Sequence, residues 1–224
     1  MSLPPGQRDI GSFPRFGIAL REPPPSIAEP ALIWVTGAVA HPLALPISRL
    51  AELPRCEVVA DFHCVTGWSV KGLYWSGVPF RTFYDTVIVP EAEPHPEVSH
   101  ILFEGADGFR TTLVLDDALD PNVLLADQLD GSALTRDHGA PLRLLSPKQY
   151  AYKSAKYLCC VELHTREPAE HYRNGVRRRL LKWLVTPHPR ARVAHEERHR
   201  YLRAWVVRGI YRHIRRLWVW AFRG

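Results

Sequence analysis

Proline recurs at short intervals along this 224-residue chain, and this feature most limits the structures that the chain can form. The 20 prolines outnumber the 14 glycines. Because proline lacks a backbone N–H and interrupts helices and inner strands, it keeps regular elements short. A simple helical bundle is therefore excluded, and a fold with many turns and irregular connections is expected.

Several apolar stretches between the prolines have the length of strands. We expect strands in residues 31–37, 43–47, 57–63, 142–145 and 157–163, and a hairpin over 98–115. Short helices are expected at 48–54, 80–87 (ended by Pro90), 116–119 and 122–126, with a turn at 75–79. Strands and helices mix without the regular alternation of a doubly wound sheet, so the predicted fold class is α+β.

The composition excludes two broad classes of protein. With 46% hydrophobic and 23% charged residues, the chain is not of the disordered kind. It has no run of 18 apolar residues, which excludes an ordinary membrane span. The first residues show no secretory signal, so we expect a cytoplasmic location.

Charge divides the chain into two parts. Residues 1–170 carry 14 Lys and Arg against 21 Asp and Glu, a net charge of −7, whereas residues 171–224 carry 15 against 2, a net charge of +13. We therefore expect a core in residues 1–168 and a basic amphipathic helical tail in 169–224. The apolar positions that define the tail's face are Leu202, Val206, Ile210, Ile214, Leu217 and Ala221.

Three interpretations of the tail stay open from its residues. Its arginines and tryptophans, among them Trp205, suit the headgroup region of a membrane, giving peripheral contact at the inner face. The tail can also fold its apolar side onto the core and expose its arginines. Nucleic-acid binding is the third interpretation, but the chain has no base-reading or RNA-binding motif and its core is acidic.

Cys64 follows an apolar strand directly and precedes the pair Gly67-Trp68. A thiolate that is held by the core and open on one side can be a metal ligand or a nucleophile. The alternative is a buried structural cysteine. The cysteines form no Cys-x-x-Cys pair, so zinc-ribbon and thioredoxin interpretations lose their main support.

A second chemical cluster lies in residues 138–157, where a histidine, an arginine and several lysines surround tight turns. Cationic side chains and backbone N–H groups suit an anionic ligand, and an arginine can bind a phosphate with two hydrogen bonds. The alternative is a basic loop exposed to water.

Together these segments resemble the molybdopterin-binding core shared by sulfite oxidases and related bacterial oxidoreductases. The resemblance covers roughly residues 12–165, with the motifs in the same order. The matching segments are Ile33–Gly37, Leu53-Pro54, Phe62–Trp68, Trp75–Pro79, Asp107–Phe109, His138–Arg143 and Tyr152–Tyr157. The resemblance implies a sulfite-oxidase-type fold with mixed β-sheets and short helices.

The resemblance also implies how the cofactor, molybdenum-molybdopterin, is bound. Cys64 corresponds to the thiolate ligand of molybdenum, which a soft metal favours. His138 and Arg143 correspond to residues that bind the cofactor's phosphate and pterin edge. The turn Ser154-Ala155-Lys156 supplies further contacts to the same anion.

The resemblance implies roles for two more residues, each in a shorter stretch that matches the family. Gly105 falls on another loop that contacts the cofactor. Arg15 falls on an N-terminal loop over the cofactor, where sulfite oxidases use an arginine to contact the substrate. The alternative for Arg15 is an exposed loop arginine.

The implied reaction is a two-electron transfer of an oxygen atom to or from a small sulfur-type substrate, sulfite-like or sulfoxide-like. No segment matches a haem domain or the immunoglobulin-like domain of sulfite oxidases, so we expect a separate electron-transfer partner, for which a membrane haem protein is one candidate. Tyr150 and Tyr152 lie near the expected pocket without matching the active-site tyrosine. The particular substrate does not follow from the resemblance.

Overall fold

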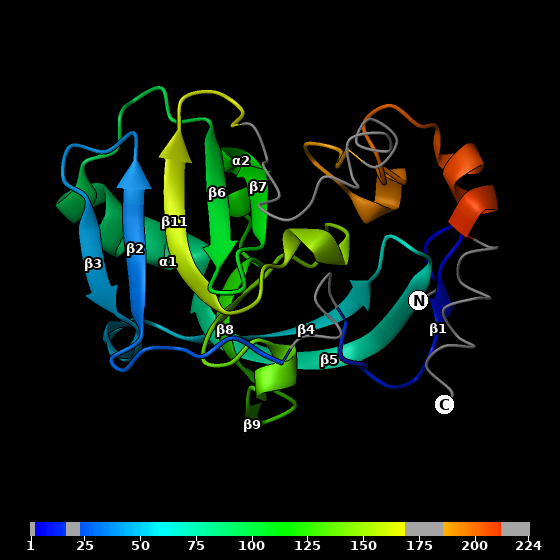
Figure 1. Ribbon diagram of the computed structural model, residues 1–224, viewed down its shortest axis with the longest axis horizontal. Coiled ribbons are helices and arrows are strands. Elements are labelled where there is room, and N and C mark those ends of the chain that lie inside the picture. The colour runs from blue at the N-terminus through cyan, green and yellow to red at the C-terminus, as the bar shows by residue number, and fades with distance from the viewer. Residues whose placement is uncertain (1–2, 17–22, 169–185, 212–224) are drawn as a thin grey trace.

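The computed structural model describes residues 3–16, 23–168 and 186–211, and its strands form two sheets (Figure 1). The first sheet has the strand order β3-β2-β11-β6-β7. These strands are β2 (Leu32–Gly37), β3 (Leu43–Pro46), β6 (His100–Gly105), β7 (Arg110–Val114) and β11 (Leu158–His164). The pair β2 and β11 is parallel, and the other neighbours are antiparallel.

The second sheet runs across the end of the first (Figure 1). Its strand order is β1-β5-β8-β10, with β4 paired to β5 and β9 paired to β8. These strands are β1 (Arg8–Asp9), β4 (Cys56–His63), β5 (Trp68–Pro79), β8 (Leu124–Leu129), β9 (Ser132–Ala133) and β10 (Arg143–Leu145). Cys64 lies in the short turn that joins the antiparallel strands β4 and β5.

The helices are short, as the frequent prolines predict. The described α-helical residues are α1 (Phe80–Phe83), α2 (Leu115–Ala118) and residues 204–211, and α1 continues into the π-helix η2 (Tyr84–Ala92). The 3-10 helices are η1 (Ile47–Glu52), η3 (Arg136–His138), η4 (Ala151–Lys153) and η6 (Val193–His195). The predicted α+β class, with mixed sheets and few short helices, is confirmed.

The buried apolar side chains form two hydrophobic clusters, and the second sheet contributes to both, with Val78 and Leu125 in the first and Leu124 and Ala126 in the second. In β2, Ile33 and Val35 are buried whereas Trp34 between them is 49% exposed, so alternate residues face the first cluster. Phe80 and Ile88 from α1 and η2 pack into the same cluster. The second cluster, built on the second sheet, is covered on one side by partly buried aromatic side chains of residues 13–16.

Most predicted strands are confirmed to within a few residues, but two predictions in the second sheet are wrong. Residues 75–79 form the end of β5 rather than a turn, because Gly77 allows the close approach of β8: a Cβ there would lie 2.2 Å from the carbonyl oxygen of Leu125. Residues 122–126 enter β8 rather than a helix. Their short apolar run suits either element, and pairing with β5 and β10 selects the strand. Pro90 lies inside η2 and does not end it.

The predicted helix from Glu170 onward lies partly outside the described residues and is wrong for 186–203. There the chain forms turns, bridges and the short η6, and only residues 204–211 are helical. The buried apolar residue of that helix is Val207, whereas Ile210 of the predicted apolar face is 46% exposed. The helix therefore turns the side that carries Val207 toward the protein, and the predicted apolar face that includes Ile210 toward the surface.

Residues 186–211, named here the C-terminal segment, pack against the second sheet and its loops. Tyr150 donates its backbone N–H to the carbonyl of Ala191 (2.9 Å), and Val193 donates to Lys148 (3.0 Å). Figure 1 shows this segment, in orange to red, at the same end of the molecule as β1. The proposed division at residue 168 therefore separates two parts of the chain that are in contact.

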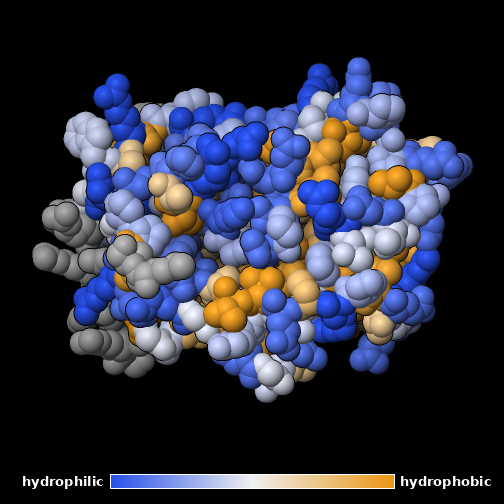
Figure 2. Space-filling view, turned by 180° about the vertical axis from the view of Figure 1, so that it is seen from behind, coloured by the Kyte–Doolittle hydropathy of each residue, from blue (hydrophilic) through white to orange (hydrophobic). Residues whose placement is uncertain are grey.

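The surface is mainly polar. Seen from behind, hydrophilic side chains cover most of the molecule, with smaller hydrophobic patches between them (Figure 2). The most exposed large apolar side chains include Val59, Tyr74, Tyr201 and Trp205. Among the described residues, no helix combines the length and apolarity that crossing a membrane requires.

Candidate cofactor site and the Cys64 turn

Cys64 lies at the first position of a tight turn. Its backbone N–H donates to the carbonyl of Trp68 (2.8 Å), and the N–H of Gly67 donates back to the carbonyl of Cys64 (3.0 Å). Gly67 has φ +97°, a conformation that glycine adopts without steric cost. The thiol is half-buried, with its Sγ 3.2 Å from Oγ1 of Thr66.

Both ends of the described chain hold this turn in place. From the N-terminal side, Gln7 donates its Nε2 to the carbonyl of Cys64 (3.1 Å) and accepts from Oγ of Ser69 (3.0 Å). From the C-terminal segment, the guanidinium of Arg198 donates through Nη1 to the carbonyl of Val65. The orientation of the Cys64 turn therefore depends on segments nearly 200 residues apart in sequence.

The surroundings of the Cys64 thiol have opposing effects on its pKa. Burial raises the pKa of the Cys64 thiol, while the hydrogen bonds with Thr66 and the positive charge of Arg198 lower it. Burial is the largest of these effects, so the free thiol keeps its proton near neutral pH. A soft metal binding there displaces that proton, because the thiolate is the ligand form.

Arg143 and His138 belong to a second group of residues, on the loops that flank β10. Arg143 is fully buried and donates to two backbone carbonyls, Nη1 to His138 (2.8 Å) and Nη2 to Ser154 (3.3 Å). Its guanidinium also lies over the rings of Phe62 and Trp75, 5.3 and 5.1 Å from their centroids. Arg143 thus joins the 138 loop to the 154 loop and to β4.

Lys156 and Arg15 extend this group toward the N-terminal residues. Lys156 Nζ donates to the carbonyls of Phe16 (2.7 Å) and Asp137 (3.0 Å). Arg15 lies beside the same loop, with its Nε 3.4 Å from Oδ1 of Asp137. The structure therefore brings Arg15, His138, Arg143 and Lys156 together, and we name these four residues the cationic cluster.

The pKa values of the cationic cluster reflect burial and mutual repulsion. Burial lowers the pKa of Arg143 to about 9. Burial, followed by the charge of Arg143, lowers the pKa of Lys156 to about 8 and also lowers that of His138. Within the described residues, Nε of Arg143 and Nδ1 of His138 are buried without a hydrogen-bond partner. An anion bound here would relieve the repulsion, so the donor set fits a phosphate-bearing cofactor.

Two glycines let the backbone approach Lys156 closely. A Cβ on Gly105 would lie 2.2 Å from the carbonyl oxygen of Lys156. Gly139 has φ +105°, and a Cβ there would lie 2.9 Å from Cβ of Lys156. Gly105 thus lies next to the cationic cluster, and no larger residue fits either position without displacing Lys156.

Ser154 and Ala155 lie in the same loop, but their side chains are engaged inside the protein. Ser154 is buried, and its Oγ accepts the backbone N–H of Ser146 (3.0 Å). The side chain of Ala155 is fully buried in the first hydrophobic cluster. In this structure both residues shape the loop that presents Lys156.

Aromatic side chains lie between the cationic cluster and the strand that leads to Cys64. Phe13 stacks on His138, with ring centroids 4.5 Å apart and planes 9° apart. Phe13 and Phe16 both contact Phe62, at 4.9 and 5.2 Å. Phe62 precedes Cys64 by two residues, so the two groups of site residues are connected through these rings.

Sequence reasoning missed the residues that support the Cys64 turn, chiefly Gln7 and Arg198. Gln7 lies in an irregular proline-rich stretch, and Arg198 is one of many arginines in the basic tail. Neither carries a motif. Only burial distinguishes Arg198, whose side chain is almost fully enclosed, from the exposed Arg203 nearby.

A comparison with known protein families identifies the class to which this fold and site belong. Residues 24–172 match the family described as "Oxidoreductase molybdopterin binding domain". The fold and the match define a molybdopterin-dependent oxidoreductase. The chain belongs to this family, and its cofactor is molybdopterin.

Individual relatives cover different shares of the chain. YuiH of Bacillus subtilis, described as an uncharacterised oxidoreductase, is 35% identical over 81% of this chain and 89% of its own length. The protein-methionine-sulfoxide reductase catalytic subunit MsrP of Gluconobacter oxydans is 30% identical over 62% of this chain, which spans 48% of that protein. The chain thus spans about half of MsrP and nearly all of YuiH.

A solved structure supports the fold. The sulfane dehydrogenase SoxCD from Paracoccus pantotrophus superposes with a TM-score of 0.55 at 21% identity, covering 64% of this chain and 40% of that one. The predicted sulfite-oxidase-type architecture is thereby confirmed at the level of the fold.

Proposed function

We propose that this oxidoreductase transfers an oxygen atom to or from a small sulfur-type substrate, at a molybdenum centre held by Cys64. The observation that carries the proposal is the half-buried Cys64 thiol, in a turn held from both chain ends and connected by Phe62 to the cationic cluster. When bound, the cofactor supplies a two-electron metal centre able to exchange an oxygen atom.

The names of two relatives support oxygen-atom transfer. MsrP is named as a methionine-sulfoxide reductase, and a relative from Leptosphaeria maculans, 31% identical over 71% of this chain, is named as a nitrate reductase. Reduction of a sulfoxide or of nitrate to nitrite removes one oxygen atom with two electrons. Within the wider family, the ordered motifs around Cys64, His138 and Lys156 favour the sulfite oxidase branch.

In this proposal the cationic cluster binds the cofactor. Arg143 and His138 hold the phosphate and the pterin edge with the buried nitrogen atoms that lack partners within the described residues. Lys156 adds a positive charge, presented by the loop of Ser154 and Ala155, and Gly105 lets its own loop pack closely against the backbone of Lys156. Arg15, which is partly exposed, contacts the substrate.

A separate protein would exchange electrons with this chain, and a membrane haem protein is our candidate. The relatives MsrP and YedZ1 of Azospira oryzae support a partner, because both are named as subunits of a reductase. We further propose a cytoplasmic location with peripheral contact at the inner face of the membrane. Cell fractionation with a tagged chain tests this, and recovery exclusively outside the cytoplasm and its membrane face would contradict it.

The function is tested with protein from a host that makes molybdopterin. We expect close to one molybdenum per chain and turnover of sulfoxide or sulfite by the wild type. Cys64→Ser should reduce turnover by more than about a hundredfold, because the hydroxyl is a poor ligand for a soft metal. Cys56→Ser is the matched control, since Cys56 is a half-buried cysteine at the opposite end of β4.

The variants must first be shown to unfold at similar temperatures. Activity of Cys64→Ser equal to that of Cys56→Ser would disprove the ligand role. Wild-type protein without molybdenum would count against the whole proposal.

A further inference from the structure

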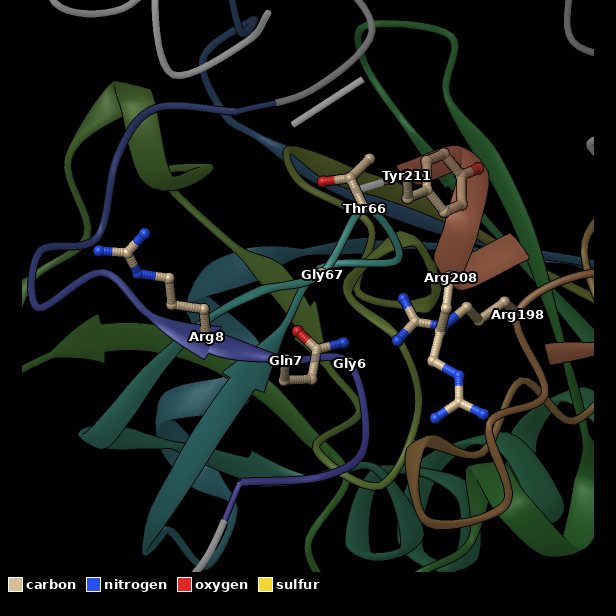
Figure 3. A pocket seen from close by; sticks show the side chains of 8 residues that line it. All are labelled: Gly6, Gln7, Arg8, Thr66, Gly67, Arg198, Arg208 and Tyr211. Carbon is tan, nitrogen blue, oxygen red and sulfur yellow. The ribbon is translucent and has the colours of Figure 1, made fainter. Parts of the chain in front are cut away.

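A cavity of about 250 Å³ lies beside the Cys64 turn, between the two ends of the described chain (Figure 3). Its lining residues include Gly6, Gln7, Thr66, Arg198, Arg208 and Tyr211. Pockets for drug-sized ligands measure roughly 300–1,000 Å³, so this cavity suits a smaller molecule. It lies next to the turn of the proposed molybdenum ligand and is separate from the cationic cluster, whose residues do not line it.

Arg198 supplies a buried positive charge to this cavity. It is 1% exposed, donates Nη2 to the carbonyl of Pro5 (3.2 Å) and lies over the ring of Tyr150, 5.0 Å from its centroid. Within the described residues its Nε has no partner, and no carboxylate forms an ion pair with it. A buried cation without a counter-charge is costly, and a bound anion would compensate it.

Arg208 supplies the second guanidinium. A Cβ on Gly6 would lie 2.9 Å from Cδ of Arg208 and 3.1 Å from Nη2 of Arg198, so both arginines flank the Gly6 backbone. In Figure 3 the side chains of Arg198 and Arg208 lie together on one side of Gly6 and Gln7, and the side chain of Arg8 lies on the opposite side. Arg208 contacts Glu196 through Nε (3.4 Å), which offsets one charge and leaves the pair of arginines net positive.

The residues that charge this cavity lie outside the part of the chain that matches the family. The match covers residues 24–172, whereas Gly6, Arg198 and Arg208 come from the two ends. The cavity therefore lies between Thr66 and Gly67, inside the matched range, and the two chain ends, which place two guanidinium groups beside that turn.

We propose that this cavity binds a small tetrahedral oxyanion and holds the charged group of an anionic substrate beside the Cys64 turn. Two guanidinium groups match an oxyanion, because their N–H donors form charge-assisted hydrogen bonds with its oxygen atoms. The assignment of this anion as part of a substrate rests on the proposed function, whereas the binding of an oxyanion does not.

Calorimetric titration of the holoenzyme with sulfate, and separately with phosphate, at low ionic strength tests the binding. We expect one saturable site per chain. Arg208→Gln should weaken binding by about tenfold or more, because it removes charge-assisted hydrogen bonds. Arg203→Gln is the matched control, since Arg203 is an exposed arginine of the same segment that does not line the cavity.

Gly6→Ala provides a second variant that displaces the side chains of Arg198 and Arg208 without changing the charge, and it should also weaken binding. Thermal unfolding of each variant shows whether it is folded. Absence of saturable binding to the wild type with either anion, or equal losses in Arg208→Gln and Arg203→Gln, would overturn the proposal.

Kinetics separate the substrate group from a free inorganic anion. We expect sulfate to raise KM without changing kcat in the wild type, and to have a much smaller effect in Arg208→Gln. Sulfate that binds without changing KM would overturn the substrate role. If the preparation lacks molybdenum, the proposed function fails, while the calorimetric titration still decides whether the cavity binds an oxyanion.

Discussion

Arg143 illustrates how a single residue can connect a motif to the fold. The sequence pattern predicts that it binds an anion, and in the structure it also donates to the carbonyls of His138 and Ser154. Because the guanidinium is planar and has five N–H donors, it can hold both loops and still present Nε toward a ligand. Its position over the rings of Phe62 and Trp75 could not be predicted from the motif.

Lys156 gives a pH-dependent prediction at the residue scale. In the cofactor-free protein its pKa is about 8, below the ordinary 10.5, because of burial and then the charge of Arg143. Between these two pH values the unfolded chain binds more protons than the folded one, so folding stability rises with pH. We expect the free energy of unfolding of the wild type, relative to Lys156→Gln, to increase from pH 7.5 to 10.

Urea unfolding at each pH measures this difference. Loading with the cofactor should reduce the increase, because an anion raises the pKa of Lys156 toward its ordinary value. If the free energy of unfolding of the cofactor-free wild type, relative to Lys156→Gln, stays constant or falls as the pH rises, the lowered pKa of Lys156 is contradicted.

At the scale of elements, the sequence predicts the strands β4 and β11 correctly, because each is an apolar run bounded by turn residues. The strands β5 and β8 were misread near residues 75–79 and 122–126. In β5, Gly77 suggests a turn in the sequence, but in the structure it allows β8 to approach closely. In β8 three consecutive buried residues, Leu124–Ala126, give no alternation, since both faces of the strand are covered.

Gly139, which follows η3, gives a prediction for the loop that carries His138. Gly139→Ala places a Cβ in a left-handed conformation and against Lys156, so it should destabilise the fold by more than about 2 kcal/mol. Gly131→Ala is the matched control. Gly131 also has positive φ but has no atom within 4 Å of its Cβ position, so the cost should be near 1 kcal/mol.

Chemical denaturation gives the two free energies, and fluorescence of the bound pterin gives cofactor retention. Only Gly139→Ala should lose the cofactor. Equal destabilisation and equal retention in both variants would show that the contact with Lys156 has no effect.

At the scale of the whole molecule, the two chain ends meet at the Cys64 turn. The C-terminal segment buries Ala191 and Val193 and supplies Arg198 to the turn, while Gln7 arrives from the other end. Removing the chain after residue 168 would therefore uncover the core as well as delete the basic tail. Point substitutions are needed to study the tail's surface alone.

The exposed aromatic residues of the C-terminal segment give the prediction for membrane contact. Trp205 is 66% exposed and near the exposed Arg203, a combination that suits an anionic lipid surface. We expect the wild type to float with vesicles rich in anionic lipid, and Trp205→Ser to reduce the bound fraction several-fold. The control is Trp34→Ser, which removes an exposed tryptophan on β2.

Flotation is measured by centrifugation through a density gradient. Equal binding of Trp205→Ser and the wild type, or equal loss in Trp34→Ser, would contradict membrane contact through this segment.

The sequence by itself determined the α+β class and most of the strands, because short apolar strands and turn residues are local signals. Its ordered motifs also carried the resemblance that singles out Cys64, His138, Arg143 and Lys156. Tertiary structure alone decided which distant segments meet. Gln7 and Arg198 hold the Cys64 turn from 57 and 133 positions away, Arg198 also contacts Pro5 across 193 positions, and Arg208 charges the cavity beside the turn. Such contacts leave no periodic pattern in the sequence, since each depends on the folded positions of both partners.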